Sequence, residues 1–246
     1  MKAVLLVLAA LVLGAPAVQA GGINLTWGSG CWQDNPSTLL AFACDSNSGS
    51  AIMTASFAFD RGPHYFSGFA FAAQLDLQSD SSVLPDWWQL TTPGGCRQGA
   101  FNGSADFTGA SGGCVDVWQG HAYVRYATWR TSLFPGGMIP PPPNRVVFWL
   151  DIWTDEVIPD VRRGVEYYGF KVTVDYQKSV GPGACGGCST PVTIVLNEIS
   201  TGWEHGWHLT NPLANTCVRW QAGGGTPCAA TPALSPTWGQ LKSLYR

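Results

Sequence analysis

Residues 166–200 read EYYGFKVTVDYQKSVGPGACGGCSTPVTIVLNEIS, and this stretch decides the fold class. Apolar side chains occupy every second position from Tyr168 to Tyr176, which is the two-residue period of a strand with one buried face. Residues 191–199 are rich in β-branched side chains and begin with a proline, so we predict a second strand there. We expect the two strands to form a hairpin around a Gly- and Cys-rich loop, in an all-β domain.

The same alternation continues outside this stretch. In the segment 145–153, aliphatic and phenylalanine side chains fall on one face, and Trp149, Asp151 and Trp153 fall on the other. A strand with large side chains on both faces is expected at the centre of a sheet. We therefore predict that residues 21–230 form one antiparallel β-sandwich cross-linked by disulfides. Its other strands are predicted at 22–27, 50–59, 67–77, 115–118, 121–132 and 217–221.

The start of the chain has the composition of a secretory signal peptide. Lys2 precedes an apolar run at residues 3–13, and small residues at 18–20 resemble a cleavage site. The apolar run is shorter than the roughly 20 residues that a membrane-spanning helix needs. We expect residues 1–20 to be removed and the mature chain to be exported without a membrane span.

Charge and composition exclude several classes of function. The formal net charge is −3 at pH 7, and basic residues form no cluster beyond Arg162-Arg163, so we predict no nucleic-acid partner. Charged residues make up 12% of the chain, about half of the usual ~25%. This low value suits an extracellular β protein. The sequence contains neither a Gly-x-Ser-x-Gly elbow nor a phosphate-binding loop, so serine hydrolase and nucleotide chemistry have no support.

The cysteines follow the predicted signal peptide, and an even number of them in an exported chain indicates disulfides. Each consecutive pair brackets a short segment rich in Gly, Asn, Ser or Pro. We therefore predict the sequential bonds Cys31–Cys44, Cys96–Cys114, Cys185–Cys188 and Cys217–Cys228.

The Cys185-Gly-Gly-Cys188 segment also has the spacing of a redox dithiol. A redox dithiol needs a helix after its first cysteine to lower the thiol pKa, and a strand is predicted here instead. A zinc site is a second alternative, with Cys217 and Cys228 as further ligands. We expect a structural disulfide.

One further cluster suggests a metal at first sight, namely Glu204, His205 and His208. On a strand, positions 205 and 208 face opposite sides, and Gly206 disfavours the helix that would bring them together. We predict no metal and no cofactor.

Tryptophan is the most unusual feature of the composition, with 12 residues. Sugar rings have apolar faces that stack on aromatic rings, so exposed tryptophans on a sheet would form a glycan-binding surface. Tryptophans more often fill a core, because each buries about 150–250 Å². Such a surface could also include Trp118, Trp203 and Trp207. Our glycan-binding candidates are Trp149, Trp153, Asp151, Trp87 and Trp88.

Asp151 also supports a hydrolase interpretation, because glycoside hydrolysis uses two carboxyl groups and an aromatic environment raises a carboxyl pKa. The second carboxylate would be Asp155, Glu156 or Glu166. The alternative is that Asp151 pairs across the sheet with Arg125, Arg130 or Arg145.

The C-terminal segment 231–246 differs in character from the domain. A Pro-containing linker precedes the decapeptide TWGQLKSLYR at 237–246, whose apolar residues lie on one side of a short helix. We expect this helix to cover a sheet edge. The alternative is a sorting segment that an export or attachment system reads.

Four features together resemble a group of uncharacterised exported bacterial proteins. They are Trp87-Trp88 with Cys96-Arg97, the EYYGFKV segment, the CGGC loop before PVTIVLN, and the terminal decapeptide. The resemblance covers most of the mature chain and implies secretion and a shared fold, but no catalytic residue. The predicted strands are also similar in plan to cohesin-like and carbohydrate-binding β-sandwiches, an analogy of architecture alone.

These observations predict a secreted or cell-surface, non-enzymatic module that binds a polysaccharide or another surface protein. Glycan binding through tryptophans is its most concrete form. One alternative is a carbohydrate-active hydrolase that uses Asp151 and a second carboxylate. The other is a structural component of a surface layer or filament, with buried rings and edge strands that bind partners.

Overall fold

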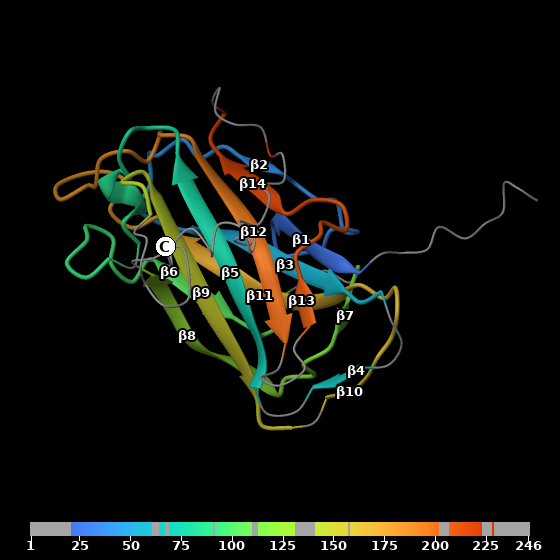
Figure 1. Ribbon diagram of the computed structural model, residues 1–246. Helices are drawn as coiled ribbons and strands as arrows, with labels where there is room; N and C mark the ends of the chain where they lie inside the picture. The colour runs from blue at the N-terminus through green and yellow to red at the C-terminus, as the bar shows by residue number, and fades with distance from the viewer. Residues whose placement is uncertain are drawn as a thin grey trace, which may run out of the picture.

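The part of the chain that the structure describes folds into two packed β-sheets with almost no helix (Figure 1). The structure is a computed structural model. The predicted signal peptide (1–20) and C-terminal helix (237–246) lie outside the residues that it describes. Within those residues, no helix is long and apolar enough to cross a membrane. The described residues are 21–60, 64–66, 69–90, 92–109, 113–130, 141–156, 158–201, 207–222 and 228.

Strands dominate the described residues, so the predicted all-β class is confirmed. A short 3-10 helix, η1 (Asp86–Trp88), lies between the fifth and sixth strands. The strands are β1 (Gly22–Trp27), β2 (Leu39–Leu40), β3 (Ser50–Ala58), β4 (His64–Phe66), β5 (Phe69–Ser79), β6 (Phe101–Ser104), β7 (Val115–Asp116), β8 (Ala122–Arg130), β9 (Arg145–Thr154), β10 (Ile158–Val161), β11 (Tyr167–Asp175), β12 (Val192–Thr201), β13 (Trp207–Leu209) and β14 (Cys217–Trp220).

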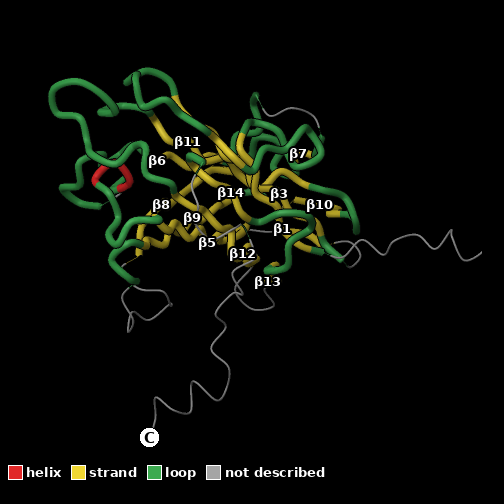
Figure 2. The backbone as a smooth tube through the Cα atoms, turned by 90° about the horizontal axis from the view of Figure 1, so that it is seen from above, coloured by secondary structure: helices red, strands yellow, loops and turns green. Residues whose placement is uncertain are grey.

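The strands form a smaller and a larger sheet. The smaller sheet has the order β1-β3-β11-β6, with β7 beside β11. The larger sheet has the order β2-β14-β12-β5-β9-β8, with β13 beside β12, and β4 pairs with β10 separately. Most neighbours are antiparallel, and β7 and β2 pair in parallel. Seen from above, β5, β8, β9 and β12 lie along one side of the molecule, and β3 and β11 lie along the other (Figure 2).

Buried aromatic side chains fill the space between the two sheets. Phe148 of β9 stacks on Phe101 of β6 with ring centroids 4.4 Å apart. Phe71 of β5 packs against Phe57 of β3 at 5.6 Å and against Phe170 of β11 at 6.4 Å. Two sheets that interdigitate in this way form a sandwich, as predicted. The outer face, defined as the face of the larger sheet opposite to Phe148, therefore points away from the smaller sheet.

β11 and β12 do not form the expected hairpin. β11 pairs with β3 and β6 in the smaller sheet, whereas β12 pairs with β5 and β14 in the larger one. The loop 176–191 therefore crosses from one sheet to the other. Each strand buries one face against the same core, and this gives the same two-residue period as a hairpin would.

Three of the four sequential disulfides are wrong, and only Cys217–Cys228 matches the prediction. A sandwich brings loops that are far apart in the sequence to the same end, so short spacing does not decide which cysteines meet. The long-range bonds are Cys31–Cys114, Cys44–Cys188 and Cys96–Cys185, with sequence separations of 83, 144 and 89.

The CGGC segment is a junction between loops. Cys185 bonds to Cys96 and Cys188 bonds to Cys44, so the two cysteines of this segment fasten two different loops. Neither the redox dithiol nor the zinc alternative fits this arrangement, because both need the two sulfurs to act together.

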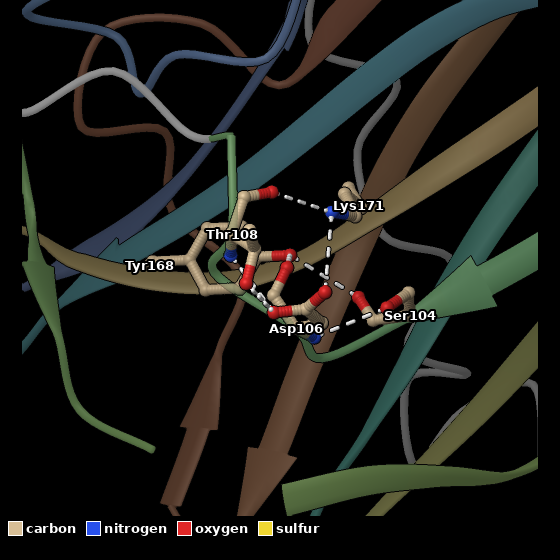
Figure 3. A network of polar contacts seen from close by, with 5 residues as sticks. All are labelled: Ser104, Asp106, Thr108, Tyr168 and Lys171. Atoms are coloured by element: carbon tan, nitrogen blue, oxygen red, sulfur yellow. Dashed lines mark hydrogen bonds and ion pairs between the residues drawn. The ribbon is translucent and has the colours of Figure 1, made fainter. Parts of the chain in front are cut away.

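A polar network fastens the loop after β6 to β11 (Figure 3). The buried Tyr168 hydroxyl donates to the backbone oxygens of Ser104 and Asp106, at 3.2 and 3.0 Å. Lys171 Nζ donates to the backbone oxygen of Thr108 at 3.0 Å. The hydroxyl and the amide of Thr108 both donate to Asp106 and lower the pKa of its carboxyl. The network therefore has a structural role.

Replacing Tyr168 by phenylalanine is expected to lower the free energy of unfolding by about 1–2 kcal/mol, because two backbone oxygens lose their donor. Burial raises the Tyr168 pKa well above its ordinary value. The stabilisation is therefore complete below about pH 10 and is lost as the pH rises through the higher pKa of the folded state. Denaturant unfolding at pH 7 to 12 measures both effects. Tyr123→Phe, at an exposed position, is the control, and the same alkaline slope in Tyr168→Phe and wild type would contradict the assignment.

Candidate functional site

β9 presents Trp149, Asp151 and Trp153 on the outer face. From Phe148 to Thr154 its residues alternate between buried and half-buried, and these three are half-buried, whereas Val147 on the same face is buried. β9 lies between β5 and β8, so its predicted central position is confirmed. Two tryptophans and a carboxylate therefore share one face of one central strand.

Polar side chains from neighbouring strands lie in the same rows of the outer face. Gln74 of β5 lies opposite Trp149, and Glu198 of β12 lies opposite Gln74. Ser200 of β12 lies two strands across from Asp151 in the next row. Directly opposite residues share a face, and neighbouring strands are about 4.8 Å apart. The outer face thus combines aromatic rings with groups that can bind hydroxyls.

A cation lies over one of the two rings. The chain bulges between Val124 and Tyr126 of β8, and the exposed Arg125 guanidinium lies 4.5 Å from the centroid of the Trp153 ring. Tyr123, which is 43% exposed, lies opposite Trp153. The cation–π contact holds Trp153 in a defined orientation.

His208 of β13 is hydrogen-bonded to Glu198, with Nδ1 and Oε1 2.5 Å apart. His208 also lies opposite Ser200, which brings together the residue types of a serine hydrolase. The Ser200 hydroxyl, however, donates to the backbone oxygen of Ala72 at 3.4 Å, not to the imidazole. The three side chains therefore do not form a nucleophile–base pair.

Arg145 pairs with Asp76 and not with Asp151. Its Nε donates to Asp76 Oδ1 at 2.6 Å, and its Nη2 donates to the other oxygen. Burial raises the pKa of Asp76, and the hydrogen bonds from Arg145 and Asn197 oppose that shift. Arg145 and Asp151 are six residues apart on one strand, roughly 20 Å, so an ion pair between them is ruled out.

The second carboxylate of the hydrolase alternative is not provided by Glu166. Glu166 lies directly before β11 of the smaller sheet, where it is buried and accepts from Asn24 Nδ2 at 3.0 Å and from the Ser56 hydroxyl. Glu156 lies in the exposed turn after β9, 3.3 Å from His121, and Asp155 precedes it. The second carboxylate of the hydrolase alternative would therefore have to be Asp155 or Glu156, which both lie in an exposed turn.

Two of the glycan-binding candidates are in the core. Trp87 and Trp88, in η1, are both 0% exposed and pack against Trp220 with ring centroids 4.9 and 5.3 Å away. Trp118 is buried as well. None of these rings is accessible to a sugar, so Trp87 and Trp88 are withdrawn. Sequence alternation does not reveal this, because the pair lies in a 3-10 turn and not in a strand.

The sequence alone did not identify Gln74, Glu198 or the stacking role of Arg125. Gln74 alternates with apolar residues in the predicted strand 67–77, but only strand pairing puts it beside Trp149. Of the three residues considered as a metal cluster, Glu204 and His205 lie outside the described residues. Within the part of the chain that is described, no group of three or more His, Cys, Asp or Glu is placed to hold a metal.

Comparisons of the chain with protein-family models, with curated proteins and with solved structures find no match. The resemblance to exported bacterial proteins stays a prediction, and a function can be proposed only from the geometry of the outer face.

Proposed function

We propose that this protein is a secreted or cell-surface, non-enzymatic module that binds glycans on its outer face. One observation carries the proposal: Trp149 and Trp153 are half-buried on the same face of a central strand. Half-burial means that part of each side chain is packed and part is exposed to solvent. Gln74 and Glu198, in the row of Trp149, supply polar groups for sugar hydroxyls.

Export is supported by two features. Four disulfides persist in an oxidising compartment and are rare in the cytosol. The first twenty residues have the composition of a signal peptide. We infer that the partner is a polysaccharide outside the cell.

The two alternative functions have weaker support. A glycosidase needs two carboxyl groups about 5–9.5 Å apart around one bond, and Glu166 is buried against Asn24 and Ser56 of the smaller sheet. If the protein were a purely structural component, its tryptophan rings would be buried, whereas Trp149 and Trp153 are half-buried. Glycan binding therefore remains the preferred proposal.

Titration of intrinsic tryptophan fluorescence tests this proposal. Oxidised protein, residues 21–246, is titrated with xylan, hydroxyethylcellulose, mixed-linkage β-glucan, galactomannan, alginate and chitosan. We expect a saturable shift with at least one polysaccharide, weakened in Trp149→Ala and in Trp153→Ala and lost in the double variant. Trp32→Ala is the matched control, because Trp32 is also half-buried but lies in the loop between β1 and β2.

Two results would contradict the proposal. The first is an unchanged emission with every polysaccharide. The second is a shift that survives both outer-face substitutions, which would place the site elsewhere on the molecule. Circular dichroism of each variant establishes that a lost shift does not come from unfolding.

A further inference from the structure

We infer that the outer face binds a linear oligosaccharide that lies along β9 and contacts both rings, and not a single sugar. The inference rests on the proposed function and specifies its ligand. Trp149 and Trp153 are four residues apart on one strand. A strand advances about 3.3 Å per residue, so the two Cα atoms are roughly 13 Å apart. One pyranose ring does not reach both tryptophans, so each ring contacts a different sugar unit.

The two rings have different surroundings, which makes them two subsites. At Trp149, Gln74 and Glu198 lie in the same row and can bind hydroxyls of a sugar that stacks on the ring. At Trp153, the Arg125 guanidinium lies 4.5 Å from the ring centroid, so a sugar at this subsite contacts a ring that is already paired with a cation. An oligosaccharide that occupies both subsites therefore contacts two different chemical environments.

The space between the rings is also polar. Asp151 lies midway between Trp149 and Trp153 on the same face, and Ser200 lies in its row. A carboxylate and a hydroxyl are both partners for sugar hydroxyls. We expect an inner sugar unit, between the two stacked ones, to contact these polar groups.

The expected consequence is a dependence of affinity on chain length. A short oligosaccharide occupies either subsite alone, so two molecules bind per protein, each weakly. A chain that spans both subsites binds once, and its second contact is intramolecular, which raises the affinity by up to about 10²–10⁴. As the oligosaccharide lengthens, the number of ligand molecules bound per protein therefore falls from two to one while the affinity rises.

Isothermal titration calorimetry tests this with oligosaccharides of one to six units cut from the polysaccharide that shifts the fluorescence. We expect the hexasaccharide to bind at least about tenfold more tightly than the disaccharide. Trp149→Ala and Trp153→Ala should each remove this gain and reduce the disaccharide stoichiometry from two to one. Trp32→Ala should leave both ligands unaffected.

Equal affinities for the disaccharide and the hexasaccharide would overturn the inference, and so would a gain that depends on only one of the two tryptophans. Either result leaves the proposed glycan function in place, with a single subsite. If no polysaccharide of the panel binds, the proposed function itself fails and this inference fails with it.

Discussion

Replacing Cys44 and Cys188 together by alanine is expected to lower the free energy of unfolding by about 3–5 kcal/mol. The bond has a sequence separation of 144, the longest of the four. In the chain-entropy model, a loop of that length restricts the unfolded chain by about 5 kcal/mol, and measured losses for native disulfides are about 2–5 kcal/mol. The bond also fastens the segment whose Cys188 oxygen accepts from Trp220 Nε1 at 2.7 Å.

Removing Cys217 and Cys228 is the matched control, because that bond has a sequence separation of only 11. Its loss is expected to be about 2 kcal/mol smaller in the same model. Guanidinium unfolding of the oxidised proteins measures both values. Peptide mapping of the unreduced protein by mass spectrometry tests the pairing directly, and a peptide that contains a Cys185–Cys188 bond would contradict it.

Replacing Trp220 by alanine is expected to cost about 3–5 kcal/mol of unfolding free energy. Trp220 is fully buried in β14, and its indole donates to the Cys188 oxygen. Truncation would leave a cavity in the core and remove this hydrogen bond. Its ring contacts are Trp27, Phe42, Trp87, Trp88 and Tyr176.

Trp149→Ala is the control for this truncation, because the same side chain is removed from a half-buried position. We expect the free energy of unfolding to fall by about 1 kcal/mol or less, together with weaker polysaccharide binding. Denaturant unfolding at 25 °C compares the two variants. Equal losses would show that Trp149 belongs to the core, and the outer face would then no longer be a candidate site.

The strand content was predictable from the sequence because it depends on neighbouring residues. Alternation over nine or ten positions, as in 145–153, identifies a strand and separates its two faces whatever the strand pairs with. That pattern placed Trp149, Asp151 and Trp153 on one face before any pairing was known, and the structure confirms it. Those three members of the candidate site were therefore predicted.

The partners of each strand and cysteine were decided only by the tertiary structure. β11 and β12 have the pattern of a hairpin, yet they belong to different sheets because each covers a side of the same core. Cys185 and Cys188 are neighbours in the sequence, yet each bonds to a distant loop.

The sequence by itself determined the long strands, their apolar faces and the position of the two outer tryptophans. The tertiary structure decided which polar groups join those tryptophans and which other tryptophans are buried. Trp88 and Trp149 have the same side chain, but one packs against Trp220 in the core and the other lies on the outer face. The physical reason is that alternation is a local property of the backbone, whereas burial and pairing depend on contacts between segments far apart in the chain.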